Sequence, residues 1–217
     1  MNKYQKLGTV ITLVLGSSAA ANAAVLYNNL PEDANVFDNG LGISGVGFYG
    51  ANKFSTGTLC PSGCTLGNIT LNLSSNDGST AGYQLQVIAD AAGAPGATLT
   101  SLNNPASFST TGDNNLFTTT GTFNLAAGTD YWVKLISSIN GGPVYWNYNN
   151  SPTQAVPNQP AQIAYDAGFG FQQLSSGPAF LMKLEATPVS SVPVPGAIWM
   201  MGSALIGLVA SWRKKAR

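Results

Sequence analysis

Two cysteines, Cys60 and Cys64, are the only thiols in this chain of 217 residues, and a Pro-Ser-Gly segment separates them. In an oxidising environment, two cysteines this close across a turn favour a local disulfide. A redox Cys-x-x-Cys motif has one residue fewer between its thiols, and a zinc site needs a second pair of ligands. We therefore predict a Cys60–Cys64 disulfide that stiffens a loop tip.

An aromatic cluster at residues 145–150, with the sequence Tyr-Trp-Asn-Tyr-Asn-Asn, has the chemistry to contact a carbohydrate. Aromatic rings stack on sugar faces, and amide side chains hydrogen-bond to hydroxyl groups. Strand alternation puts Trp146 and Tyr148 on the same face. We favour packing of the rings in the core, because aromatic residues dominate sandwich cores. The alternative is glycan contact, for which Trp146, Tyr148 and Asn149 are the candidates.

The sequence has few residues suited to catalysis or to metal binding. The chain has no histidine, which excludes Ser-His-Asp and Cys-His catalysis and histidine-ligated metals. Residues 33–40 miss the calcium-loop spacing by one position and are better explained as a turn. The acidic residues Asp90, Asp113, Asp130 and Asp166 are expected in separate turns, with no pair placed across a sugar ring. We predict a protein that is not an enzyme and has no metal or cofactor.

The elements that must position these residues are strands. Apolar and polar residues alternate most clearly over residues 70–74, 83–87, 131–135 and 180–185. Further strands are expected at residues 25–28, 53–56, 116–125, 144–148 and 162–165. Segments rich in Gly, Asn, Asp and Pro lie between them and predict turns, among them residues 76–78 and 93–96.

No stretch keeps a helical period for three turns, so nothing is available to cover a parallel sheet. The sequence predicts an all-β fold, an antiparallel, jelly-roll-like β-sandwich over residues 24–186. Its predicted core consists of Phe54, Leu71, Leu85, Val87, Phe123, Tyr131, Val133, Trp146, Met182 and Leu184. The Pro-rich segment 187–196 is predicted to be an extended linker, because proline supports neither a helix nor a strand ladder.

Charge is distributed unevenly along the chain. Six of the nine basic residues lie near the two ends, whereas the part between them has three lysines and all nine acidic residues, a net charge of −6. Nucleic-acid binding needs a clustered basic face. Nucleic acid is therefore not an expected partner.

The first 23 residues have the three parts of a secretory signal peptide. Lys3 and Lys6 precede an apolar segment at residues 7–15, and small residues end the segment at Ala21 and Ala23. We predict a signal helix that signal peptidase removes by cutting before Ala24. The alternative, an uncleaved membrane helix, needs roughly 20 apolar residues, more than this segment has.

Residues 197–212 form a run of 16 residues without charge. As a helix this run would be roughly 24 Å long, a little short of the bilayer core. Basic residues follow it and favour a cytoplasmic C-terminus by the positive-inside rule. The sequence therefore predicts a single transmembrane helix with a basic tail over residues 197–217.

The order of parts in this tail is specific. The motif Val192-Pro193-Val194-Pro195-Gly196 precedes the apolar run, and Arg213, Lys214 and Lys215 follow it. This arrangement resembles the PEP-CTERM sorting signal of Gram-negative bacteria, although the family's commonest form has Glu where this chain has Val194. The resemblance implies an exosortase that removes the helix and delivers the body to the cell surface or extracellular matrix. The alternative is an ordinary single-pass anchor.

The body also resembles a known type of extracellular domain. Residues 85–96 and 123–133, a strand with a Gly-Pro turn and a strand after a Gly turn, are similar to the choice-of-anchor R type. That resemblance implies a β-sandwich displayed at bacterial surfaces and brings no catalytic residues. We expect an exported protein that begins as an inner-membrane anchored precursor, is then surface-displayed or extracellular, and contributes to adhesion or to a biofilm matrix. The alternative is a carbohydrate-binding module that recognises exopolysaccharide.

Overall fold

Fourteen β-strands and no helix form the part of the chain that the structure describes. The computed structural model describes residues 23–33, 39–149, 162–168, 170–174 and 179–189. Every pairing between the named strands is antiparallel. The prediction of an all-β, antiparallel fold is confirmed.

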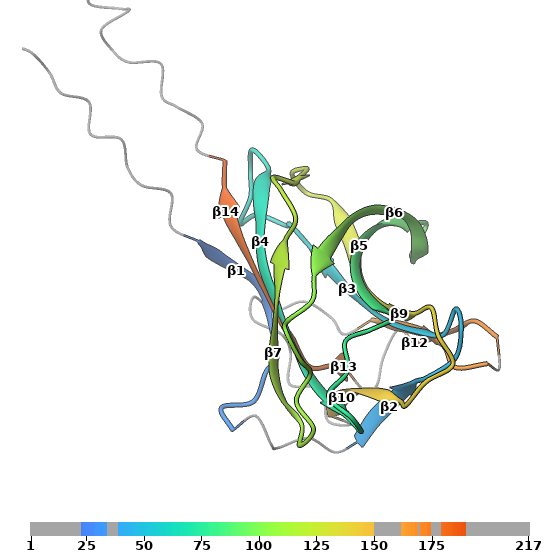
Figure 1. Cartoon of the computed structure of the whole chain (residues 1–217). Helices are drawn as coiled ribbons and strands as arrows, with labels where there is room; N and C mark the ends of the chain where they lie inside the picture. Colours follow the sequence, from blue (N-terminus) through green and yellow to red (C-terminus); the bar gives the residue numbers. More distant parts are fainter. Residues whose placement is uncertain (1–22, 34–38, 150–161, 169, 175–178, 190–217) are drawn as a thin grey trace, which may run out of the picture. The chain divides into compact units, whose positions relative to one another are not determined.

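The first half of the sheet is built around its longest strand, β4 (Cys64–Ser75). In spatial order it contains β1 (Ala24–Asn28), β14 (Met182–Pro188), β4 and β7 (Asp113–Thr119), which run side by side in Figure 1. Three shorter strands and β10 extend it: β2 (Asn39–Ile43), β8 (Asn124–Leu125), β10 (Val144–Asn149) and β13 (Ala179–Phe180).

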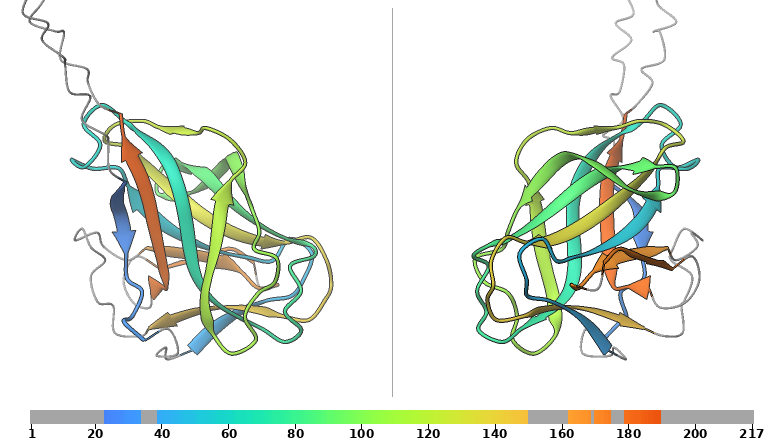
Figure 2. Two further views of the ribbon diagram at one scale, coloured as in Figure 1. Left: turned by 60° about the vertical axis from the view of Figure 1, so that its left-hand side comes forward. Right: turned by 90° about the vertical axis from the view of Figure 1, so that its right-hand side faces the viewer.

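The second half of the sheet has six strands. In spatial order they are β12 (Gln172–Leu174), β11 (Ile163–Asp166), β3 (Tyr49–Ser55), β9 (Asp130–Ser137), β5 (Tyr83–Ala91) and β6 (Ala94–Asn103). The two halves are joined where β6 pairs with β7 through Leu102 and Asn103. The sheet curls so that the halves face each other (Figure 2), and side chains from both form one main core.

The main core is formed by apolar side chains at alternating positions of the strands. On β4, Ile69, Leu71 and Leu73 are fully buried and point into the space between the halves. Of the ten predicted core residues, nine are buried, and Phe123 is half-buried and packs against the core. Burying this much apolar surface is the main term that favours the fold. The sequence pattern therefore located the core correctly.

Strand boundaries differ from the prediction at several points. Strands β2, β6 and β12 were not expected, and the predicted strand at residues 116–125 is divided into β7 and β8. The predicted strand at residues 180–185 is interrupted at Leu181, whose backbone N–H donates to the Asn147 carbonyl. Its own carbonyl accepts from the Asn72 N–H and the Trp146 indole. Leu181 thus links β10 to β4 instead of continuing one ladder.

Two predicted boundaries need adjustment. The turn expected at residues 93–96 is a tighter two-residue loop of Ala92 and Gly93, because Ala91 pairs with Ala94. Both loop residues have positive φ, 54° and 89°, as a hairpin loop of this length requires. At the other boundary, β14 extends into the predicted linker and ends at Pro188, opposite Cys64. Proline is tolerated there because the ladder ends at that residue.

The predicted signal helix and transmembrane helix lie outside the described residues. Within the described residues, no helix is long and apolar enough to cross a membrane.

Candidate functional site

The predicted glycan residues lie on β10. Trp146 is fully buried, its ring stacks on Phe180 at 4.7 Å between centroids, and its indole N–H donates to the Leu181 carbonyl at 3.0 Å. Because no face of this ring is open, Trp146 packs in the core, as the favoured interpretation predicts, and is not a candidate for glycan contact. Tyr148 is half-buried and meets Phe180 edge-on, and Asn149 is half-buried beside Ala179. Glycan contact by Tyr148 and Asn149 stays a prediction.

Trp146 is buried because its side chain lies in the main core. Its strand, β10, is also an interior strand. It pairs with β2 on one edge and with β4 and β13 elsewhere, so both sides are occupied. Two glycines of β2, Gly40 and Gly42, lie opposite Asn147 and Tyr145. A Cβ atom at Gly40 would come within 2.8 Å of Asn147 and 2.9 Å of Tyr145. Glycine therefore permits the close approach of β2 to β10.

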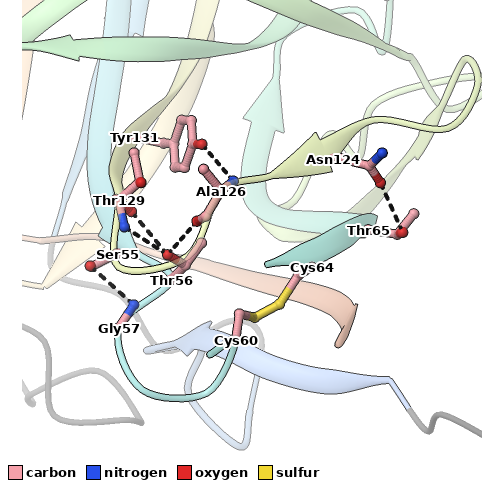
Figure 3. The surroundings of a disulfide bond; sticks show 10 residues. All are labelled: Ser55, Thr56, Gly57, Cys60, Cys64, Thr65, Asn124, Ala126, Thr129 and Tyr131. Atoms are coloured by element: carbon pink, nitrogen blue, oxygen red, sulfur yellow. Dashed lines mark hydrogen bonds between the residues drawn. A yellow bond between two sulfur atoms is a disulfide. The ribbon is translucent and has the colours of Figure 1, made fainter. Parts of the chain in front are cut away.

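The Cys60–Cys64 disulfide is present, with 5.5 Å between the two Cα atoms, as predicted. Figure 3 shows it beside a set of hydrogen bonds that hold the same end of the molecule. The Thr56 hydroxyl donates to the Ala126 carbonyl at 2.8 Å and accepts from the Thr129 N–H at 2.9 Å. The Ala126 N–H in turn donates to the Tyr131 hydroxyl. The segment between β3 and the disulfide loop is therefore fixed to the loop before β9.

The same loop holds the end of β14. Cys64 pairs with Pro188, and the Val189 N–H donates to the Gly63 carbonyl at 3.0 Å. Gly63 has a φ of 89°, and a Cβ atom there would lie 2.8 Å from the Leu125 carbonyl oxygen. Only glycine fits this position without displacing backbone. The disulfide thus stiffens the place where the described part of the chain ends.

Two of the scattered acidic residues meet at one lysine, which the sequence did not indicate. The Lys53 ammonium lies 3.3 Å from Asp90 and 2.9 Å from Asp130. Asp90 also accepts from the Trp132 indole N–H and the Gly93 N–H, each at 2.8 Å. Residues from β3, β5 and β9 are thereby joined at one point.

The charge states of this cluster argue against acid catalysis. Burial alone would raise the pKa of Asp90, but the N–H donors of Gly93 and Trp132 and the Lys53 ammonium outweigh it, so the pKa lies below its ordinary value. Burial opposes the charge of Lys53, but Asp130 and Asp90 outweigh it and raise the pKa of Lys53. A general acid needs a raised carboxyl pKa. The cluster is suited to holding strands together.

The cluster lies under the tip of the β5–β6 hairpin. In the sheet, β5 is separated from β12 by β9, β3 and β11. The Gly93 carbonyl at the hairpin tip nevertheless accepts a hydrogen bond from the Gln173 side chain of β12. The hairpin therefore folds across the outer face of the second half, where Figure 1 shows β6 curling. Beneath it lies a second, small cluster, the Trp132 cluster, of Ala51, Ile88, Trp132 and Ala164.

Beyond the hairpin, the same outer face is open and polar. Register defines two rows of side chains across β5, β9, β3 and β11: Gln84, Ile136, Tyr49 and Asp166, then Gln86, Lys134, Ala51 and Ala164. We use the name polar face for the side chains of Gln84, Gln86, Lys134, Ile136 and Tyr49. Gln84 is exposed and the other four are half-buried.

A groove of about 390 Å³ opens along one side of the polar face. It is lined by Gly82, Tyr83, Gln84, Gln86, Ile136, Ser137 and Ser138. The amides of Gln84 and Gln86 therefore border a space large enough for part of a sugar chain. Among the described residues, the groove and the polar face beside it are the candidate ligand site.

Lys134 and Tyr49 form the centre of the polar face. The Lys134 ammonium lies 4.4 Å from the centroid of the Tyr49 ring, in a cation–π contact. Burial lowers the pKa of Lys134. Burial raises the pKa of the Tyr49 hydroxyl, and the nearby charge of Asp166 raises it further. The face thus carries one lysine among hydrogen-bonding groups, and Asp166 lies one strand beyond Tyr49.

Sequence reasoning did not identify the polar face. The alternation over residues 131–135 did put Lys134 on the side opposite Tyr131. Its neighbours Gln86 and Ala51, however, come from strands about fifty and eighty residues earlier. The signal that was available is the pair of glutamines, Gln84 and Gln86, at outward positions of one strand.

Most of the predicted processing residues are outside the described part. Ala21 and the sorting motif with Arg213, Lys214 and Lys215 lie outside the described residues, whereas β1 begins at Ala24, immediately after Ala23. The segment at 33–40 is only partly described. Among the described residues, no three His, Cys, Asp or Glu side chains lie together as a metal site would require.

Comparisons with known proteins assign no family. No protein-family model matches the chain, and no curated protein matches it.

Proposed function

We propose that this chain is an exported, non-enzymatic surface or extracellular-matrix protein of a Gram-negative bacterium, sorted by an exosortase. In this proposal, signal peptidase cuts before Ala24, and the tail of residues 197–217 anchors the precursor in the inner membrane. The exosortase then acts near residues 192–196 and releases the body to the surface. The body contributes to adhesion or to a biofilm matrix, and its curled sheet is a jelly-roll-like β-sandwich.

One observation carries this proposal. The start of β1 and the end of β14 lie at the same end of the body, because Ala24 pairs with Ala186 in the antiparallel ladder and Pro188 pairs with Cys64. A body that begins and ends at one place can be held from that side while the rest projects away. The disulfide loop braces the same place, and disulfides persist outside the cytoplasm.

The test is the mass and the terminal sequences of the protein recovered from its host, after separation of inner membrane, outer surface and medium. We expect an N-terminus at Ala24 and a C-terminus near residues 192–196. The double variant Pro193→Ala/Pro195→Ala should accumulate in the inner membrane with its tail intact. Pro105→Ala, which changes a proline within the body, is the matched control. Recovery of the unaltered chain to Arg217 at the inner membrane would contradict sorting.

The polar face favours a second function, binding of exopolysaccharide. The side-chain amides of Gln84 and Gln86 line the groove, and amide groups form hydrogen bonds with sugar hydroxyls. The double variant Gln84→Ala/Gln86→Ala should weaken binding of the host's own polysaccharide by about tenfold, as expected for the loss of two hydrogen bonds. Gln172→Ala, which changes an exposed glutamine on β12, is the control.

A further inference from the structure

Only three basic residues occur between residues 24 and 192, and two of them are paired. Lys53 contacts Asp90 and Asp130. Lys183 contacts Glu185 at 2.6 Å. Among the described residues, no carboxylate lies within 4.0 Å of the third, Lys134. In a body with an excess of acidic residues, an ammonium group without a carboxylate partner is the exception.

The surroundings of Lys134 favour the binding of an anion next to its ammonium group. The side chain is half-buried on the polar face, with Gln86 and Ala51 as its neighbours in register. Its ammonium rests over the ring of Tyr49, which restricts its direction. A cation that is partly removed from water is stabilised by an anion placed against it. Asp166, the nearest acid on this face in the register, lies one strand beyond Tyr49 and accepts from the Gly168 N–H.

We propose that the polar face binds an acidic polysaccharide, with Lys134 contacting the carboxylate of a uronic acid unit. The amides of Gln84 and Gln86 then hydrogen-bond to the hydroxyls of the same or the next unit along the groove. This inference rests on the carbohydrate-binding function proposed above and names its substrate class.

The chemistry of the face matches a carboxylate better than a phosphate. A single ammonium balances the single charge of a uronate, and the remaining groups are uncharged donors and acceptors suited to a sugar ring. Phosphate carries nearly two charges and is typically held by several cationic or backbone donors.

The experiment is calorimetric titration of the full chain in detergent with three probes. These are an oligomer of uronic acids, a neutral glucan oligomer of the same length, and inorganic phosphate. Lys134→Gln removes the charge and keeps a polar side chain that is one atom shorter, and Lys134→Arg keeps the charge. Lys183→Gln, which removes a paired lysine from β14 in the other half of the sheet, is the matched control. The thermal midpoint of each variant is measured alongside.

We expect the oligouronate to bind the unaltered chain more tightly than the glucan does. Lys134→Gln should weaken oligouronate binding by about tenfold, the usual effect of one charge-assisted hydrogen bond, while Lys134→Arg and Lys183→Gln stay within about threefold. Oligouronate binding to the unaltered chain should also weaken as salt is raised. This last measurement needs no variant, so it holds even where a substitution prevents folding.

The outcomes separate the two proposals. If the glucan binds as tightly as the oligouronate and Lys134→Gln changes neither, carbohydrate binding stands and the acidic specificity is wrong. If phosphate displaces the oligouronate at equal concentration, the site is a general anion site and the inference is overturned. If neither oligomer binds the unaltered chain, both the inference and the carbohydrate-binding function fail.

Discussion

Two tryptophans, both fully buried, occupy opposite sides of the sheet. Trp146 lies in the main core, stacked on Phe180, and donates to the Leu181 backbone carbonyl. Trp132 lies on the outer face under the β5–β6 hairpin and donates to the carboxylate of Asp90. The first is buried by the curl of the whole sheet, whereas the second is buried by one hairpin held with polar contacts. Although the two side chains are equally buried, we therefore expect them to contribute differently to the free energy of unfolding.

The largest difference should appear when each ring is removed. Trp146→Ala is expected to lower the free energy of unfolding by about 3–5 kcal/mol, because the main core cannot close around the cavity. Trp132→Ala should cost about 2–3 kcal/mol, because its small cluster lies near the surface and the hairpin can settle into the space. Denaturant unfolding of both variants measures the two losses. Equal losses would show that the hairpin covers Trp132 as firmly as the sheet covers Trp146.

A smaller effect is expected at the carboxylate that holds the hairpin. Asp90→Ala leaves the Trp132 indole, the Gly93 N–H and Lys53 each short of a partner, and should cost about 2 kcal/mol. The free energy of unfolding from denaturant titration checks this value. Asp113→Ala changes an exposed acid in the first half of the sheet and should stay within about 0.5 kcal/mol. A loss at Asp113 equal to that at Asp90 would argue against a specific role of the hairpin contacts.

Low pH should reduce the stabilisation that comes from the contacts around Trp132, and it should leave the stabilisation from Trp146 unchanged. Because the pKa of folded Asp90 lies below its ordinary value of 3.8, its charge stabilises the fold above that value. This contribution is lost as the pH falls through the folded pKa. The difference in unfolding free energy between the unaltered chain and Asp90→Asn should therefore shrink as the pH is lowered from 5 through the folded pKa of Asp90. The decrease should be a fraction of the loss of unfolding free energy seen in Asp90→Ala. Trp146→Phe should keep the pH dependence of the unaltered chain.

The smallest effect is expected at the tip of the hairpin. Ala92 has a φ of 54°, a conformation that favours glycine. Ala92→Gly should relieve this strain and raise the free energy of unfolding by about 0.5 kcal/mol, since the added freedom of the unfolded chain offsets part of the gain. Gly93→Ala, at a φ of 89°, should have the opposite sign. The thermal midpoint reports both changes, and a destabilised Ala92→Gly would refute the strain argument.

The two tryptophans also show what sequence could predict. Alternation alone identified Trp146 as a core candidate and put Trp132 on the side opposite Tyr131. It could not reveal that the outer side is covered, because the cover comes from the β5–β6 hairpin and its contact with Gln173 of β12. Strand β6 was itself missed. Its Thr-Leu-Thr-Ser stretch consists mostly of polar residues, and its place in the sheet depends on pairing with β5.

The candidate site could not be predicted from local sequence signals either, because it also depends on contacts between distant strands. The Cys60–Cys64 disulfide was predictable because four positions of separation fix the two Cα atoms near each other. The polar face brings together residues of β3, β5 and β9, and their neighbourhood is set by register between strands far apart in the chain. Strand β2 was missed because its two glycines carry no alternation, although they are what allows it to lie against β10.

The position of β14 has a mechanical consequence. This strand is hydrogen-bonded to β1 on one edge and to β4 on the other, and its last residues are held by the disulfide loop. A pull on residue 189 along the strand axis would load both ladders in shear, so their hydrogen bonds would have to break together. A pull across the axis would separate them one at a time. A tether leaving β14 in line with the strand would therefore resist flow far better than one leaving at an angle.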